Sequence, residues 1–110
     1  MTFTTELRHN QVIFRIQGDL ISEKEGATVI QAAESALQQQ VRHCLIDISG
    51  LRYINSSGIG ILITVLTKFR NRGGDVYLIN PSESVQKLLI ITKLNSIFNI
   101  IRNENEVPQP

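Results

Sequence analysis

The sequence predicts an α/β domain, with a mixed, mostly parallel β-sheet of four to five strands packed with three to four α-helices. Strand patterns alternate with amphipathic helical patterns along the chain, an order typical of parallel strands joined by helical crossovers. Residues 44–48 are apolar on both faces apart from Asp47, as in a central strand covered on both sides. The length of 110 residues fits a single domain.

The first two strands are predicted to form a hairpin. In residues 12–17 side chains alternate with a period of two, which is typical of a strand with one buried face. Residues 2–8 alternate more weakly, and we expect them to pair with this strand through a turn at 9–11. Gly18 and Asp19 are expected to end the second strand.

Two helices and the central strand follow. Ser22 and Glu25 fit a capping box, which places a helix at about 22–39. Ser49-Gly50 is expected to end the strand at 44–48 and to open a short loop. A second helix is predicted over 57–70, because apolar residues lie along one broad face and glycines follow its end.

The last part of the chain predicts one more crossover. Residues 76–79 read as a buried strand, and Asn80 and Pro81 are expected to cap and begin a third helix that ends near Lys93. Residues 97–101 form a last short element. We therefore expect one domain over 1–102 and a frayed tail over 103–110, which is polar and holds two prolines.

Composition excludes several classes of function. The net charge is +1 and no predicted face concentrates basic residues, which argues against nucleic acid or an anionic membrane as the main ligand. The longest apolar stretch, 59–66, is far shorter than the roughly 20 residues of a membrane span. No signal peptide pattern opens the chain. The only cysteine, Cys44, is expected in the core, so no internal disulfide forms and we predict a cytoplasmic protein.

The chemically informative segment joins the central strand to the second helix. Asn55, Ser56 and Ser57 are all good N-cap residues at a helix start that offers free amides and a partial positive charge. One interpretation is a well-capped helix and nothing more. The other adds a phosphate to one of the serines, because a helix N-terminus stabilises that charge. Such a phosphate would leave the fold intact and change the surface that a partner meets.

Enzymatic alternatives lack their motifs. The esterase elbow needs glycines two residues either side of the serine, but Ile54 precedes Ser56. His9 lies in a predicted turn and His43 at a predicted strand start, so neither suggests the base of a Ser/His/Asp catalytic triad. Asp47 is expected to hold the residues after it by hydrogen bonds.

No cofactor or metal is predicted. Gly58 and Gly60 begin a dinucleotide fingerprint, but Ile63 stands at its third glycine. Histidine and cysteine do not cluster at metal-ligand spacing. The apolar residues of 88–91 and 97–101 are read as core, with a homodimer contact as the alternative.

Residues 47–60, Asp-Ile-Ser-Gly-Leu-Arg-Tyr-Ile-Asn-Ser-Ser-Gly-Ile-Gly, resemble the signature of the STAS domain, the family of bacterial anti-sigma factor antagonists. The resemblance covers nearly the whole chain. Residues 18–20 resemble the family's turn after its second strand, 72–74 its helix stop, and 85–94 its third helix.

This resemblance implies a non-enzymatic regulator of transcription that works by partner switching. The unphosphorylated antagonist binds an anti-sigma factor, which is itself a serine kinase that uses ATP; phosphorylation breaks the complex, and a PP2C-type phosphatase restores binding. The implied phospho-acceptor is Ser56. The implied docking surface consists of Asp19, Ile21, Asn55, Ser56, Ser57 and Gly58.

Two residues depart from the family's pattern. Asn55 stands where the better-known antagonists carry Asp, and Ile21 occupies a position that is often Asp. Both departures favour the alternative to a phosphorylated switch: a cytosolic STAS subunit of a membrane transporter or of a larger signalling assembly, in which Ser56 caps and docks without a phosphate cycle. A small enzyme is the third hypothesis, and no visible motif gives it a mechanism.

Overall fold

The computed structural model describes residues 1–107 and confirms the predicted fold class. Five strands form one sheet in the spatial order β1-β2-β3-β4-β5. β1 and β2 are antiparallel, and every other neighbouring pair is parallel. The strands are β1 (Thr2–Arg8), β2 (Gln11–Leu20), β3 (His43–Ile54), β4 (Asp75–Ile79) and β5 (Asn99–Ile101). The helices are α1 (Glu23–Gln38), α2 (Ser56–Asn71) and α3 (Glu83–Ile91), with short 3₁₀ turns η1 (Leu94–Ser96) and η2 (Glu104–Glu106).

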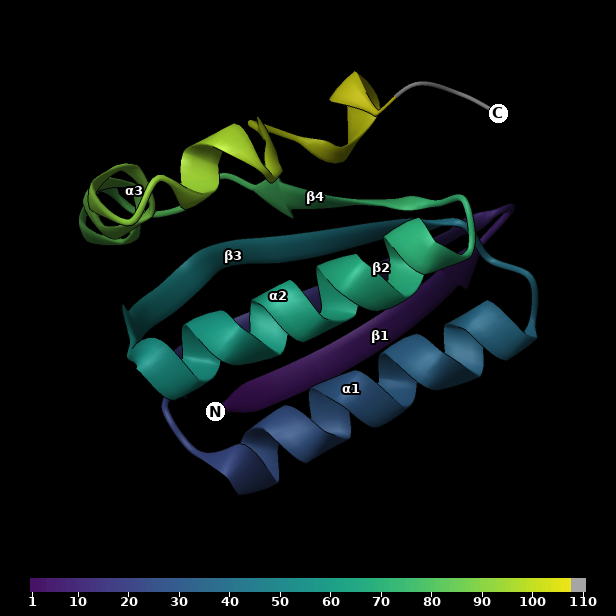
Figure 1. Cartoon of the computed structure of the whole chain (residues 1–110), viewed down its shortest axis with the longest axis horizontal. Helices are drawn as coiled ribbons and strands as arrows, with labels where there is room; N and C mark the ends of the chain where they lie inside the picture. Colours follow the sequence, from purple (N-terminus) through teal and green to yellow (C-terminus); the bar gives the residue numbers. More distant parts are fainter. Residues whose placement is uncertain (108–110) are drawn as a thin grey trace.

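The main core lies between the sheet and two helices. α1 and α2 run side by side along one face of the sheet, and α3 lies at the end where β3 passes into α2 (Figure 1). Alternate residues of β2, β3 and β4 point into this core, as the period of two requires. Cys44 is among them, and its burial raises the pKa of the thiol, which confirms its role as a core residue.

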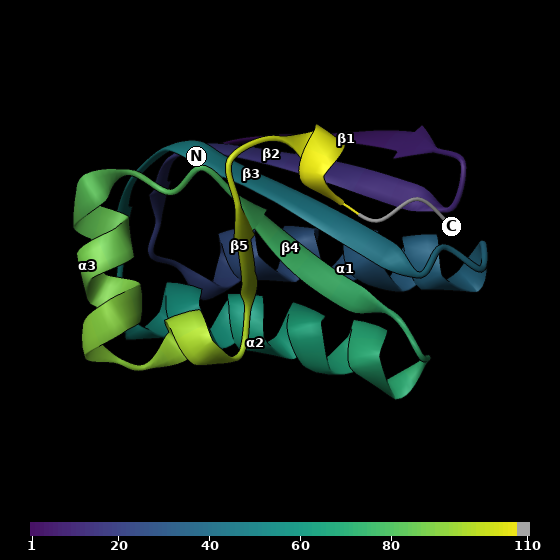
Figure 2. The same ribbon diagram turned by 90° about the horizontal axis from the view of Figure 1, so that it is seen from above.

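A second, smaller apolar cluster lies on the other face of the sheet. It contains Ile13, Leu45 and Ile79, and Val107 packs over them with 2% of its surface exposed. Figure 2 shows η2 on the side of the sheet opposite α1 and α2. The expectation of a frayed tail is therefore wrong for residues 103–107, because one valine finds an apolar site on the sheet; residues 108–110 lie outside the described part of the chain.

β2 and β3 both run further than their sequences predict. Gly18 does not end β2: it takes a left-handed conformation with φ of 90°, and the strands shift register beside it and remain paired to Leu20. Ser49-Gly50 likewise does not end β3, since Gly50 pairs with β2 and the strand continues to Ile54. Cross-strand pairing thus overrides both turn signals.

The predicted helices all form, with one shifted start. α1 begins after Ser22 and α2 after Asn55, whose side chains cap them. α3 begins at Glu83 and ends at Ile91, so the prediction of Pro81 as its first residue is wrong: Asn80 takes a left-handed φ of 50°, and Ser82 is the N-cap. Within residues 1–107 no helix is both long and apolar enough to cross a bilayer.

Candidate functional site

The first turn of α2 presents two exposed serines. Asn55 is the N-cap, its Oδ1 accepting from the Gly58 amide at 2.9 Å, while its carbonyl oxygen accepts from the Ile59 amide at 2.9 Å. Ser56 and Ser57 are therefore the first two helical residues, and both are exposed. Among the hydrogen bonds of residues 1–107, none engages their amides, so these face outward at the positive end of the helix dipole.

The connector between β2 and α1, residues 21–22, packs against this turn. The Asn55 side chain donates from Nδ2 to the Ile21 carbonyl oxygen at 3.1 Å. A Cβ on Gly58 would lie 2.2 Å from the Leu20 carbonyl oxygen, so only glycine permits this close approach. The Ile21 side chain is 48% exposed beside these contacts. The connector and the start of α2 thus form one continuous surface.

The structure places the predicted docking residues at the same end of the sheet, where β2 and β3 finish. Asp19 pairs across the strands with Tyr53 just before the connector. The Asp19 carboxylate lies 3.5 Å from the Arg52 guanidinium, and its Oδ1 is buried without a hydrogen-bond partner. Among residues 1–107, the exposed Arg52 guanidinium is the cation that forms an ion pair with Asp19.

Arg52 and Tyr53 belong to this surface but were not among the predicted docking residues. The Arg52 side chain is 72% exposed and Tyr53 is 67% exposed, and the guanidinium lies 6.0 Å from the tyrosine ring centroid. They line a shallow groove of about 480 Å³ between β3 and the start of α3, which Ser82 and Ser84 complete. Arginine and tyrosine are typical of protein interfaces, and that composition beside the polar triplet is the signal that could have found them.

The charge around Ser56 suits an added anion. Residues Ser56–Ile59, the first turn of α2, include no acidic side chain. The helix dipole and the two outward amides favour negative charge at this point. The uncharged cap, Asn55, leaves that potential unopposed, whereas an aspartate there would reduce it. The electrostatics of this helix start are therefore favourable to an anion beside Ser56.

The residues considered for a catalytic triad lie apart. The Asp47 carboxylate accepts from the Ser49 amide at 3.0 Å and from its hydroxyl at 2.7 Å, which confirms that Asp47 holds the residues after it. His43 stands at the opposite end of β3 from Ile54, and His9 is in the hairpin turn. Within residues 1–107 no three metal-binding side chains come together.

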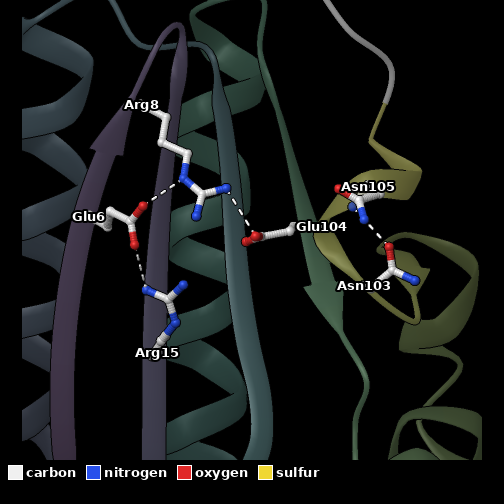
Figure 3. A network of polar contacts seen from close by, with 6 residues as sticks. All are labelled: Glu6, Arg8, Arg15, Asn103, Glu104 and Asn105. Atoms are coloured by element: carbon white, nitrogen blue, oxygen red, sulfur yellow. Dashed lines mark hydrogen bonds and ion pairs between the residues drawn. The ribbon is translucent and has the colours of Figure 1, made fainter.

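A separate polar network joins the hairpin to the C-terminal turn on the other face of the sheet (Figure 3). Glu6 bonds Arg8 at 2.6 Å and Arg15 at 3.0 Å, and Arg8 also reaches Glu104 at 3.0 Å. The guanidinium groups of Arg8 and Arg15 lower the pKa of Glu6. This network fixes η2 over the small apolar cluster and takes no part in the surface around Ser56.

Sequence comparison identifies what this architecture is similar to. The STAS domain family model matches residues 2–107. An anti-sigma F factor antagonist of Paenibacillus polymyxa is 24% identical over 106 residues, which cover 94% of this chain and 91% of the relative. An anti-sigma-B factor antagonist of Bacillus subtilis is 30% identical over 94 residues, which cover 83% of this chain and 82% of the relative.

Structural comparison agrees on the fold. The Bacillus cell fate determinant SpoIIAA in its phosphorylated form superimposes with a TM-score of 0.76 at 20% sequence identity, over 96% of this chain and 95% of that one. At this level of identity the likeness establishes the arrangement of strands and helices, and the chemistry of the site has to be argued from the residues themselves.

Proposed function

The chain belongs to the STAS domain family, and we propose that it acts as an anti-sigma factor antagonist whose Ser56 is its phosphorylation site. The observation that carries the proposal is the exposed Ser56 hydroxyl at the first position of α2, with free amides around it and no acidic neighbour in that turn. The two relatives described above are named as anti-sigma factor antagonists, which supports the same role here.

In the proposed cycle the unphosphorylated protein binds an anti-sigma factor and thereby frees a sigma factor. The docking surface consists of Asp19, Ile21, Asn55, Ser56, Ser57 and Gly58, and we add Arg52 and Tyr53 as its neighbours. Exposed Tyr53 and Ile21 supply apolar contact, while Asp19 supplies a charge for a cationic group of the partner. The chain provides a binding surface in this proposal and no catalytic group.

Phosphorylation by the partner ends the complex. The anti-sigma factor is proposed to be a serine kinase that uses ATP. The Ser56 Oγ attacks the γ-phosphorus, the bond to ADP breaks, and the hydroxyl proton passes to a base on the kinase. The new group brings about −1.5 to −2 charges at neutral pH. The helix start tolerates that charge, but a closely packed partner does not, and a PP2C-type phosphatase restores binding. We place this cycle in the cytoplasm, where ATP is available.

Mass spectrometry after incubation with the cognate anti-sigma factor and ATP tests the site. We expect one phosphate on the wild-type chain and none on Ser56→Ala. Ser57→Ala is the matched control, because Ser57 is also exposed one residue later in the helix; it should still accept one phosphate. A phosphate that persists in Ser56→Ala refutes the assignment. A chain that binds a partner but accepts no phosphate would instead fit a STAS subunit of a transporter or signalling assembly.

A further inference from the structure

We propose that the side-chain amide of Asn55 is a positioning group that locks the connector, residues 21–22, onto the start of α2 and holds the docking surface in its binding shape. The inference deepens the proposed function, and the expected change in affinity rests on that function. The expected change in the motion of the free protein is independent of it.

Asn55 uses both ends of its amide. The oxygen accepts from Gly58 at 2.9 Å within its own helix, and the nitrogen donates to Ile21 at 3.1 Å, 34 residues away in sequence. One rigid planar group therefore ties the helix start to the connector. The first bond is an ordinary N-cap. The second bond is the unusual one, because it joins two separate parts of the predicted docking surface.

The connector has few other ties to α2. The Ser22 hydroxyl bonds with Glu25 and so serves α1. The Arg52–Asp19 pair beside the connector joins two partly exposed side chains at 3.5 Å, and such pairs contribute little. Among the hydrogen bonds of residues 1–107, the bond from Asn55 is the only one between residues 21–22 and the first turn of α2. Leu20 before Ile21 is held by β2 and Ser22 after it by α1, so the bond from Asn55 is what ties the Ile21 backbone to α2.

An aspartate at position 55 could not make this bond. A carboxylate accepts hydrogen bonds and donates none, so it would cap Gly58 as well as the amide does. Toward Ile21, however, two acceptor oxygens would face each other and repel. The difference between Asn55 and the Asp of the better-known antagonists is thus a gained donor as well as a lost charge. In this chain Ile21 and Ser56 are held as one unit.

Asn55→Asp and Asn55→Ser separate the two roles of the amide. Both replacements keep an acceptor for the Gly58 amide and remove the Nδ2 donor that reaches Ile21. A carboxylate donates nothing, and the serine hydroxyl, which can donate, lies on a shorter side chain and is already engaged as the cap acceptor. The serine variant adds no charge. In the free protein we expect ¹⁵N order parameters at Ile21 and Ser22 to fall from about 0.85 toward 0.6 or below. The melting temperature should fall by no more than the few degrees that one lost exposed hydrogen bond accounts for, because aspartate and serine keep the cap on Gly58.

Affinity for the anti-sigma factor should fall roughly three- to tenfold in both variants, as expected for one lost neutral hydrogen bond. Asn105→Asp is the matched control: it makes the same charge change at an exposed residue of η2, on the other face of the sheet, and should change neither motion nor affinity.

Each outcome decides the inference. Order parameters that stay at the wild-type value in both variants overturn it, since the connector is then held without Asn55. An affinity loss without added motion at Ile21 also overturns the inference, because Asn55 would then act as a direct contact with the partner. A higher affinity in Asn55→Asp overturns the inference too. If the wild-type chain binds no anti-sigma factor, the proposed function fails, while the order parameters still decide whether Asn55 holds the connector.

Discussion

Gly58→Ala tests whether the close approach between α2 and β2 sets the geometry of the site. The added Cβ would lie 2.2 Å from the Leu20 carbonyl oxygen and 2.6 Å from Cγ1 of Ile54. The carbonyl cannot retreat cheaply, because Leu20 and Ile54 are paired neighbours in β2 and β3. Such overpacking costs about 1–3 kcal/mol, and the better helix propensity of alanine returns up to about 1 kcal/mol.

Because the clash is with a backbone oxygen, the cost belongs in the upper part of that range, about 2–3 kcal/mol. The expected net loss is therefore about 1–2 kcal/mol in the free energy of unfolding, or roughly 4–8 °C in melting temperature for a domain of this size. Urea denaturation followed by circular dichroism measures it. Gly60→Ala is the control: the residue lies two positions later in the same helix, and nothing lies within 4 Å of its added Cβ. It should stabilise the protein by about 0.5–1 kcal/mol. If Gly58→Ala unfolds at the same urea concentration as Gly60→Ala, or a higher one, the steric argument is wrong.

A doubly charged phosphate on Ser56 should weaken binding to the anti-sigma factor by about 10²–10³. Ser56→Asp, which adds one charge, should weaken binding by a smaller factor and change the melting temperature little, which calorimetric titration and a melt on one sample would check. Arg8 and Arg15 hold the pKa of Glu6 below its ordinary value of 4.5, so the stability that Glu6 contributes is fully present above pH 4.5 and is lost as the pH falls through the lowered pKa. Glu6→Gln should therefore make the free energy of unfolding fall less steeply with pH, as measured by urea titrations between about pH 6 and pH 3. Val107→Ala removes two buried methyl groups and should cost about 1–2 kcal/mol, whereas no change in the urea midpoint would mean that η2 contributes no stability.

The fold was predictable because its signals are local and repeated. The period of two in residues 12–17 and the caps at Ser22 and Asn55 each specify an element from a few neighbouring residues. The lengths of β2 and β3 were not predictable in this way. Gly18 and Gly50 read as turn residues, yet in the structure each lies in a paired strand, where register and a bulge accommodate it.

In the candidate site too, the features set by neighbouring residues could be predicted, and those set by contacts distant in sequence could not. The polar triplet Asn55, Ser56 and Ser57 at a helix start follows from contiguous residues, so the sequence alone indicated it. Which of the three caps the helix was left open, and the structure gives that role to Asn55. The bond from Asn55 to Ile21 spans 34 residues and depends on how β2 and β3 end beside each other, which no local pattern encodes. The contribution of Val107 was missed for the same reason, since its apolar site is assembled from three different strands.

The packing around α2 bears on how a phosphate at Ser56 would act. The first turn of α2 cannot shift toward the sheet, because Gly58 already lies against the Leu20 carbonyl oxygen. The Asn55 side chain also bonds both the Gly58 amide and the Ile21 carbonyl oxygen. The outward amides of the turn can stabilise the new charge where it stands. A phosphate added to such a rigid element has little internal motion to drive. Its effect would therefore fall on the partner, through charge and bulk at the contact surface. Ser56→Asp, which has one charge and less bulk, should reproduce only part of that effect.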